Sequence, residues 1–420
     1  MHETELHRLI ALAVFIGTYV GLGIGRLPPF RVDRTGVAII GAAVMVVTGV
    51  IPWDAAVAAV DAHTLVLLFG MMIVAAYLRL SGFFRLVTEL AVRRARTPVG
   101  LLGMIIVAAG GLSALFVNDV VCLVMAPVVV DVTRQLRLPP LPYLIALATA
   151  ANVGSVATLT GNPQNTLTGN PQNMLIGSFS GIAYRTFLLR EIPVAIIGLA
   201  VVFAVIRLRY RRELAASLEL VGLRGRFPVH YPLMIKTLMV VLIMLVAFLS
   251  GVPIALVAIG GAAYTLLTRR IKPEKVYREI DWELLVLFSG LFVVIGGVEA
   301  SGLAQELLAG VAAGNLYRPA VLTAVTAALS NLVSNVPAVL LFKPVIPTFG
   351  EPTRGWLLLA MASTLAGNLT ILGSVANLIV VEEARAGGIV ITFREYSTVG
   401  VPVALGTLLV GWLILTLVPV

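Results

Sequence analysis

The chain has 420 residues, of which 59% are hydrophobic and 12% are charged, and its mean hydropathy is +1.01. A soluble domain carries about twice that fraction of charged residues, so the composition predicts a polytopic membrane protein. The net charge of +9 comes from loops between apolar segments, which favours a membrane-orientation signal over nucleic-acid binding. Cys122 is the only cysteine and the four histidines are scattered, so neither an intrachain disulfide nor a metalloenzyme is expected.

Apolar segments long enough to cross a bilayer recur along the chain. In the first half we predict spans near 9–25, 36–51, 64–80 and 189–207, a split segment at 99–130 and a broken span at 141–182. In the second half we predict spans near 233–249, 252–268, 284–300 and 401–418, a split segment at 319–349 and a broken span at 355–384. The split segments each carry a polar tip and then Pro127 or Pro344, which predicts re-entrant hairpins. Each half then contributes five crossings and one hairpin.

The two halves resemble each other in sequence. DAHTLVLLFG from Asp61 matches DWELLVLFSG from Asp281, LSALFVND matches LSNLVSNV, and TLTGNPQN matches TILGSVAN at Thr370–Asn377. Three matches in the same order indicate a duplicated architecture. Because five crossings are an odd number, the repeats must be inverted. We therefore predict an all-α polytopic membrane protein with unwound helices at the midplane, in which repeats 1–207 and 233–420 are joined by a cytoplasmic linker, 208–232.

The distribution of Lys and Arg agrees with this topology. If residues 207–236 are cytoplasmic, the predicted crossings also place loops 26–35, 79–98, 131–140, 268–283 and 382–400 inside. These six loops hold 24 of the 30 Lys and Arg residues. The positive-inside rule is thus obeyed, and it predicts a multi-pass protein of the plasma (inner) membrane with both termini extracytoplasmic.

Polar residues at predicted membrane depth mark a candidate binding site for a small solute. Helix-breaking and polar residues inside apolar spans expose backbone N–H and C=O groups, which hold polar or anionic solutes in transporters. The predicted substrate-binding residues are Asn118 and Asn335 at the hairpin tips and Thr158, Gly161, Asn162, Asn165, Gly373, Ser374 and Asn377 in the broken spans. For Asn118 and Asn335, hydrogen bonds that hold helices together are the alternative.

Asp119 is the only carboxylate near these predicted clefts. A carboxylate at membrane depth costs free energy and is usually functional, so we predict that Asp119 couples transport to a proton or a sodium ion. The alternative is that its side chain caps the hairpin through nearby backbone N–H groups. We expect no other cofactor and no metal site. No nucleophile–base constellation stands out, so an enzyme is not expected, and no soluble ATPase module is present in the sequence.

The octapeptide TLTGNPQN occurs twice in tandem, at 158–165 and 166–173, whereas its counterpart TILGSVAN occurs once. Asn118 and Asn165 are 47 positions apart, which is closer to the 42 positions between Asn335 and Asn377 than the 55 positions between Asn118 and Asn173. This spacing favours the first copy as the part that lines the site. The residues MLIG after Asn173 favour the second copy, because LIVV follows Asn377 in the same way. The surplus copy, Thr166–Asn173, is either an added loop or helix, or an insertion without a role.

Four motifs together resemble the ion transporter superfamily, over nearly the whole chain. They are FVNDVVCLVMAPVV, GSVATLTGNPQN, SNVPAVLL and GNLTILGSVANLIVVE, and they are similar to the branch that holds arsenite efflux permeases, bacterial sodium/proton antiporters and the melanosomal P protein. The resemblance implies a central site between hairpin tips and unwound helices, reached from the two sides in turn by elevator-like movement. Dicarboxylate symporters of the superfamily pair Ser-Asn-Thr motifs at both tips, whereas this chain has Val117-Asn118-Asp119 and Ser334-Asn335-Val336. A di- or tricarboxylate is therefore a poor match.

The residues and the resemblance together predict a secondary transporter that exports arsenite or antimonite in exchange for protons. A neutral, hydroxyl-rich solute such as arsenous acid suits amide and hydroxyl partners, and no arginine near the site would pair with a carboxylate. One alternative is a sodium/proton antiporter or a sodium-coupled inorganic-anion permease, and another is an anion channel of the P-protein type. The resemblance also implies an arsenite-stimulated ATPase subunit, as a partner of some relatives. It is also compatible with a homodimer of this chain.

Overall fold

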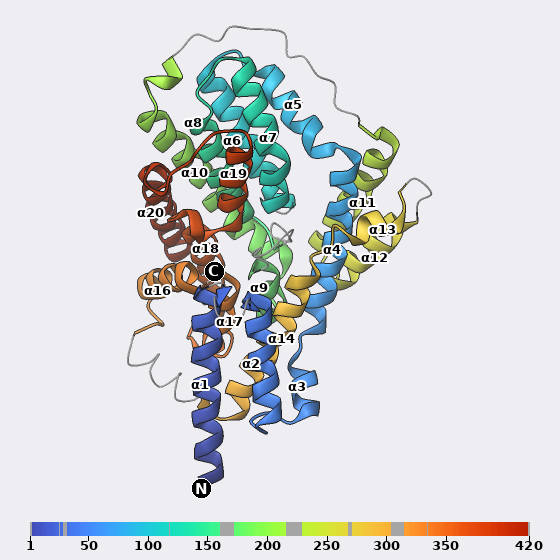
Figure 1. Cartoon of the computed structure of the whole chain (residues 1–420), viewed down its shortest axis with the longest axis vertical. Coiled ribbons are helices and arrows are strands. Elements are labelled where there is room, and N and C mark those ends of the chain that lie inside the picture. The colour runs from blue at the N-terminus through green and yellow to red at the C-terminus, as the bar shows by residue number, and fades with distance from the viewer. Residues whose placement is uncertain are drawn as a thin grey trace.

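The computed structural model describes residues 2–24, 26–27, 32–116, 118–159, 172–215, 229–267, 271–303, 315–333 and 335–418. Nearly all of these residues are helical, and the strands β1 (Arg26–Leu27) and β2 (Val32–Asp33) form one short antiparallel pair. The protein is thus a bundle of helices (Figure 1).

The helices of the first half follow the predicted order. They are α1 (His2–Ile24), α2 (Arg34–Val47), α3 (Trp53–Ala59), α4 (Ala62–Ser81), α5 (Phe83–Arg94), α6 (Pro98–Leu115), α7 (Asn118–Gln135), α8 (Leu141–Ser155), α9 (Gln172–Ser180) and α10 (Tyr184–Arg209), followed by the 3₁₀ turn η1 (Glu213–Ala215). The predicted first hairpin is the pair α6 and α7, and the predicted broken span is the pair α8 and α9.

The second half repeats this order. It contains α11 (Tyr231–Leu249), α12 (Ile254–Leu266), α13 (Pro273–Tyr277), α14 (Trp282–Ala300), α16 (Pro319–Val333), α17 (Asn335–Phe342), α18 (Pro352–Ala366), α19 (Val375–Ala386) and α20 (Phe393–Leu417), with the 3₁₀ turns η2 (Ile346–Thr348) and η3 (Ile371–Gly373). The second hairpin is α16 and α17, and the second broken helix is α18 and α19.

Seven described helices are long and apolar enough to cross a membrane. They are α1, α4, α6, α10, α11, α14 and α20, whereas α2, α8, α12 and α16 are apolar but shorter. The structure therefore confirms a mainly helical protein with several membrane-spanning helices. This criterion applies to the long helices, and the shorter and broken helices lie outside it.

The helices pack as two groups. A scaffold group consists of α1–α4 and α11–α14, and a hairpin group consists of α6–α10 and α16–α20. In Figure 1 the scaffold group occupies the lower and right parts of the molecule, and α5 runs along the top between α4 and α6. Contacts are more extensive within each group than between the groups. The predicted broken spans and hairpins thus fall into a single packed unit.

Matching helices of the two halves make matching contacts in the scaffold group. α4 packs against α12, and α2 packs against α14. Glycines permit both crossings: a Cβ on Gly70 would lie 2.6 Å from the backbone of Ala258, and one on Gly290 would lie 2.9 Å from the backbone of Ala38. Only small residues permit such close helix approach in a membrane bundle.

Aspartates begin the corresponding helices α4 and α14. Asp61 Oδ1 accepts a hydrogen bond from the backbone N–H of Thr64, and Asp281 Oδ1 accepts one from the backbone N–H of Leu284. These N-caps satisfy backbone donors that a helix leaves unpaired in its first turn. Both aspartates therefore mark the start of corresponding helices in the two halves.

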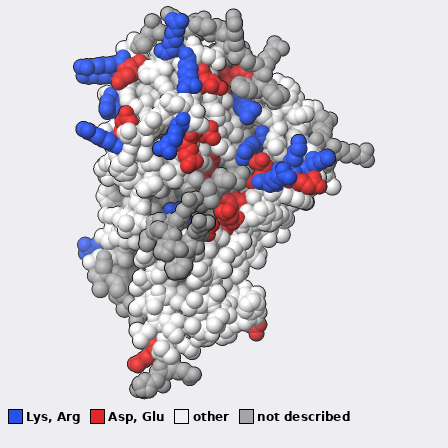
Figure 2. All heavy atoms as spheres, viewed as in Figure 1, with Lys and Arg blue, Asp and Glu red and all other residues white. Residues whose placement is uncertain are grey.

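Charged side chains are concentrated over one part of the surface. Figure 2 shows Lys and Arg side chains over the upper part of the molecule and around α13, while much of the lower part is uncharged. We call the end of the bundle where α4 passes into α5 and where α7 passes into α8 the basic end. It carries Arg79, Arg85, Arg134 and Arg137, all in segments that the sequence places in positively charged loops.

Candidate functional site

Four buried asparagines join the first hairpin tip to both broken helices. Asn118, the first residue of α7, donates from Nδ2 to Asn152 Oδ1 in α8 over 3.0 Å. Asn152 Nδ2 donates to Asn368 Oδ1 at 2.9 Å and to Asn377 Oδ1 at 3.0 Å in the other half of the chain. None of the four side chains is more than 2% exposed. Asn152 is thus the centre of a hydrogen-bonded amide cluster that links the two halves.

The unwound segment between α18 and α19 closes around this cluster. Ser374 Oγ donates to Asn152 Oδ1 at 2.9 Å. Asn377 Nδ2 donates to the backbone carbonyls of Gly367 and Thr370 at 2.8 and 3.0 Å. Both carbonyls lie where the helix opens, and that of Thr370 also accepts from the backbone N–H of Gly373 in η3. The Asn377 amide thus ties the end of α18 to the start of α19 across the break.

Asn173 performs the same task across the break between α8 and α9. Its Nδ2 donates to the backbone carbonyls of Ser155 and Thr158, each at 3.1 Å. These acceptors lie 18 and 15 residues before Asn173, whereas those of Asn377 lie ten and seven residues before it. Both offsets differ by eight residues, the length of one octapeptide. Asn173 is therefore the structural counterpart of Asn377.

This geometry supports the second octapeptide copy at one position. Spacing predicts Asn165 as the counterpart of Asn377, whereas the MLIG that follows predicts Asn173, and Asn173 makes the hydrogen bonds that correspond to those of Asn377. α9 begins at Gln172, so the second copy continues directly into the helix. Gly161, Asn162 and Asn165 lie outside the described residues, and their part in the site remains a prediction.

Thr158, the last predicted residue before that undescribed segment, anchors the break to the first hairpin. Its Oγ1 donates to the backbone carbonyl of Ala114 near the end of α6, and its side chain is 3% exposed. In the other half, Thr370 Oγ1 donates to Asn331 Oδ1, on α16, at 3.4 Å. A Cβ on Gly373 would lie 2.7 Å from that same oxygen, so glycine is needed there for the close approach.

Asp119 points from the first hairpin tip to the second broken helix. Its carboxylate accepts a hydrogen bond from the backbone N–H of Ala376, the second residue of α19. The N-terminus of a helix carries a partial positive charge, which stabilises an anion placed there. The side chain is 2% exposed, and Oδ2 has no hydrogen-bond partner within the described part of the chain. Asp119 thus contacts the opposite half and does not act only as a cap of its own hairpin.

The second hairpin tip differs from the first because its polar atoms are unpaired. Asn335, the counterpart of Asn118, is 1% exposed, and neither its Oδ1 nor its Nδ2 has a partner among the residues described. The same holds for Ser330 Oγ on α16 and for Asn173 Oδ1 on α9. A buried polar group without a partner costs roughly 1–3 kcal/mol. Buried amide and hydroxyl atoms of Asn335, Ser330 and Asn173 are thus left without partners in the described structure.

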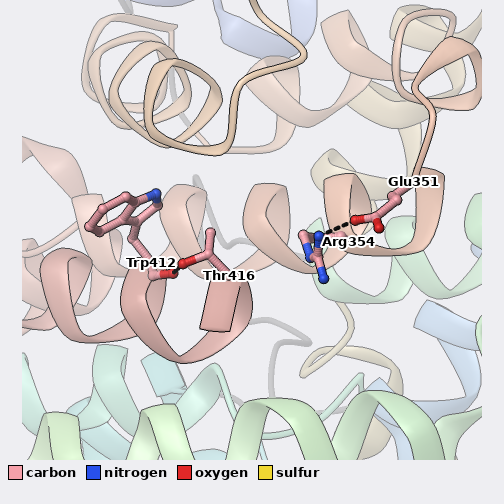
Figure 3. Close-up of polar contacts among 4 residues, drawn as sticks. All are labelled: Glu351, Arg354, Trp412 and Thr416. Carbon is pink, nitrogen blue, oxygen red and sulfur yellow. Dashed lines mark hydrogen bonds and ion pairs between the residues drawn. The ribbon is translucent and has the colours of Figure 1, made fainter. Parts of the chain in front are cut away.

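Positive charge is absent from the buried part of the described structure. No Lys or Arg side chain with a described environment is buried. Arg354, in the first turn of the broken helix α18, forms an ion pair with Glu351 beside the end of α20, where Trp412 and Thr416 lie (Figure 3). No group of three or more His, Cys, Asp or Glu side chains in the described ranges could hold a metal ion. The site is therefore built from amides, hydroxyls and one carboxyl group.

A cavity of about 700 Å³ opens beside the first hairpin at the basic end. Pro127 and Asp131 of α7 and Glu383 of α19 line one wall, and Arg79 and Glu279 of the scaffold group line the other. Arg79 and Glu279 form an ion pair at 2.7 Å. The cavity therefore separates the scaffold group from the half of α7 that follows Asp119.

The two groups touch at the opposite end. Ser178 Oγ of α9 donates to Asp61 Oδ2 of α4 at 2.8 Å, and α17 packs against α14. Phe179 of α9 also packs edge-to-face against Phe292 of α14, with ring centroids 6.2 Å apart. The described structure is thus closed at this end of the group interface and hollow at the basic end.

Sequence reasoning missed two polar residues in the interior. Asn152 lies in the predicted broken span 141–182, but its central position cannot be read from the sequence, because three of its partners, Asn368, Ser374 and Asn377, lie more than 200 residues away. Glu191 lies inside α10 with 0% exposure, although it had no assigned role. The available signal was a carboxylate within the predicted span 189–207, just before Pro193.

Comparisons with known proteins agree with this architecture. The family model described as citrate transporter, CitMHS, matches residues 12–366. The silicon efflux transporter LSI3 of Oryza sativa subsp. japonica is 30% identical, over 98% of each chain. The putative transporter arsB of Dictyostelium discoideum is 22% identical, over 92% of this chain and 88% of its own.

A solved structure has the same fold. The crystal structure of the Alcanivorax borkumensis YdaH transporter superposes with a TM-score of 0.62 at 18% identity, covering 99% of this chain and 98% of that one. The fold, the apolar helices and the family match together confirm the predicted resemblance to the ion transporter superfamily. The protein is a multi-pass membrane transporter that belongs to the CitMHS citrate transporter family.

Proposed function

We propose that this transporter exports a small uncharged metalloid hydroxide, above all arsenous acid, in exchange for protons. The observation that carries the proposal is the chemistry of the buried site. Asn335, Ser330 and Asn173 offer unpaired amide and hydroxyl atoms, and no described Lys or Arg is buried with them. An undissociated acid with several hydroxyl groups can donate to and accept from such atoms without bringing a net charge.

The same chemistry disfavours citrate as the substrate, in spite of the family's name. Transfer of several carboxylates into a buried site costs much free energy unless cations or many donors compensate. Arginine is the usual partner, because its fork pairs with a carboxylate through two hydrogen bonds. Arg354 is paired with Glu351 at the surface and does not reach the site.

Two relatives support a metalloid substrate. A silicon efflux transporter matches the chain along almost its whole length, and a putative arsB transporter matches over most of it. Silicic and arsenous acids share the property that the site requires, since both are small, neutral and rich in hydroxyl groups near neutral pH. We therefore place both in the substrate class and give arsenous acid priority.

Asp119 is the residue we assign to proton coupling. Its carboxyl lies between the two halves, at the N-terminus of α19, where movement of either half would change its surroundings. An ionised carboxylate is stabilised there by the helix end, whereas water-free surroundings favour the protonated form. A small structural change can therefore switch Asp119 between binding and releasing a proton.

The proposal also includes the architecture and the transport cycle: the two halves are inverted repeats, and the site opens to the two sides of the membrane in turn. Support comes from the paired contacts of α2 with α14 and α4 with α12, and from the matching breaks at Asn173 and Asn377. The positive-inside rule makes the basic end cytoplasmic. The hollow basic end and the closed opposite end then correspond to a state that faces the cytoplasm, the side from which an exporter collects its solute.

Growth of an arsenite-sensitive bacterial host tests this function. Expression of the chain should restore growth on arsenite, and Asp119→Asn should abolish the rescue while the variant remains in the membrane. The matched control is Glu299→Gln, since Glu299 lies exposed at the end of α14. Failure to rescue, combined with sodium-dependent alkalinisation of vesicles, would instead establish a sodium/proton antiporter.

A further inference from the structure

Glu191 is a carboxyl-bearing residue inside the spanning helix α10 that the proposed site does not use. Its side chain is 0% exposed, and neither carboxyl oxygen has a hydrogen-bond partner in the described structure. A buried ionised carboxylate without a partner costs several kcal/mol or more, so the group must be neutral in this state. An acid retained inside a membrane helix at such a cost is usually functional.

The packing of α10 places Glu191 at the level where α8 unwinds. α10 packs against α8, and a Cβ on Gly198 would lie 2.7 Å from Val153 Cγ1. Glu191 lies seven residues before Gly198, so it is on the same face of α10 and roughly 10 Å along the helix axis. Gly103 and Gly110 of α6 face Phe203 and Leu199 of α10, so α10 runs antiparallel to α6. α8 runs parallel to α6, because Tyr143 donates to the Pro98 carbonyl and Gly154 meets Gly110. The shift therefore leads beyond Ser155, the last residue of α8, and places Glu191 beside the break.

The other half of the chain supports this placement. EIPVA at 191–195 of α10 matches GVPVA at 400–404 of α20, so Gly400 is the counterpart of Glu191. A Cβ on Gly400 would lie 2.4 Å from the backbone carbonyl oxygen of Asn368, directly after α18. The corresponding position in α20 thus touches the unwound backbone. In α10 the residue at this position carries a carboxyl group.

The helices that pack against α10 bring few charged residues, and the end of α8 brings partial negative charge. α8 ends beside Glu191, and the C-terminus of a helix carries exposed carbonyls with partial negative charge, which disfavours an anion and favours a proton. Among the helices packed against α10, α6 has no charged residue and α8 has only Tyr143 as a titratable one. The remaining titratable or charged residues of these helices are Arg354 on α18, Tyr231 and Lys236 on α11, Arg394, Glu395 and Tyr396 on α20, and Tyr184, Arg185, Arg190, Arg207 and Arg209 on α10 itself.

We propose that Glu191 is a second proton-binding residue of this transporter, separate from Asp119. The inference rests on the proposed proton-coupled export. In the described state Glu191 carries a proton and is sealed from water. When the hairpin group moves against the scaffold group, the Glu191 carboxyl meets water on one side, releases the proton as a hydrated ion and becomes a carboxylate. It takes up a proton from the other side before the next cycle.

The test uses the full-length protein reconstituted in liposomes, with arsenous acid as the solute and a pH-sensitive dye as the reporter of protons. Glu191→Gln imitates the protonated carboxyl but cannot release a proton. We expect this variant to keep arsenous acid counterflow and to lose about half of the protons moved per solute, because one of two coupling carboxyls is gone. Glu191→Asp should retain the wild-type ratio, and the exposed control Glu299→Gln should leave both quantities unchanged.

A spectroscopic measurement supports the same test without relying on transport. Infrared spectra of the wild-type protein should contain a protonated-carboxyl C=O band that is absent in Glu191→Gln and loses intensity as pH rises through the working range. A variant with the wild-type proton ratio, or a Glu191 band that does not change with pH, would show a permanently neutral structural group. If the wild type does not transport arsenous acid but the Glu191 band titrates, the proposed substrate fails and the proton site stands.

Discussion

Asn152 and its partners show how single residues define the interior of this transporter. One amide side chain connects Asn118 at a hairpin tip to Asn368 and Asn377 in the other half of the chain. Amides suit this role because each provides donors and acceptors without charge. The tip that carries Asp119 is therefore held in place by internal hydrogen bonds, while the tip that carries Asn335 is left with unpaired atoms.

The duplicated octapeptide yields a residue-scale prediction. Because the two copies are identical, deletion of either one gives the same chain, so only point substitutions distinguish them. Asn173→Ala removes two hydrogen bonds to buried carbonyls and should destabilise the protein by about 1–3 kcal/mol. Thermal melting in detergent measures the effect, with Asn165→Ala as the matched variant. A larger loss for Asn165→Ala would contradict the pairing of Asn173 with Asn377.

A second residue-scale prediction contrasts the two polar clusters. Asn335→Ala removes a side chain that has no partner in the described structure, so stability should hardly change while the KM for the solute rises. Asn152→Ala leaves the polar atoms of three other asparagines without partners and should lower stability by on the order of 1–3 kcal/mol for each group. Melting and transport kinetics on both variants check the contrast. A strongly destabilised Asn335→Ala would show that this amide has a structural role.

At the scale of elements, a close backbone contact determines the distance between α8, the first part of the broken helix, and α6 of the first hairpin. A Cβ on Gly154 of α8 would lie 2.1 Å from the backbone oxygen of Gly110 in α6. Gly154→Ala should therefore force the two helices apart and cost about 1–3 kcal/mol. Gly111→Ala is the matched control, because a Cβ there meets nothing within 4 Å. Equal melting temperatures for the two variants would contradict the described packing of α6 on α8.

Much of the element order could be predicted from the sequence, and the failures have physical causes. The hairpins and broken helices were predicted because Gly, Pro, Asn and Ser interrupt otherwise apolar segments. α5 was not predicted because Arg85, Arg93 and Arg94 give it the composition of a loop, although it lies between the two groups of helices. The role of Asn173 could not be settled from the sequence, because spacing favours the first octapeptide and the following MLIG favours the second. The roles of Asn152 and Glu191 could not be predicted either, because they depend on helices that come together only in the folded chain.

At the scale of the whole molecule, the proposed function requires that the cavity at the basic end be open to the cytoplasm. Val124 of α7 lines this cavity, and its counterpart Leu341 on α17 is also half-buried. A membrane-impermeant thiol reagent applied to the cytoplasmic side should therefore label Val124→Cys. The native Cys122 is 0% exposed and should not react. Leu341→Cys should resist the reagent from either side, whereas rapid labelling of it from outside would contradict the described state.

Everted membrane vesicles provide the most direct test of the central claim, proton-driven export of a neutral metalloid hydroxide through a site without buried cations. In such vesicles export becomes uptake into the lumen, and an acidic lumen supplies the protons. The proposal predicts that an acidic lumen drives arsenous acid uptake, that Asp119→Asn abolishes this stimulation, and that citrate is not taken up. Uptake of citrate without arsenous acid or silicic acid, or uptake that does not respond to the pH gradient, would contradict it.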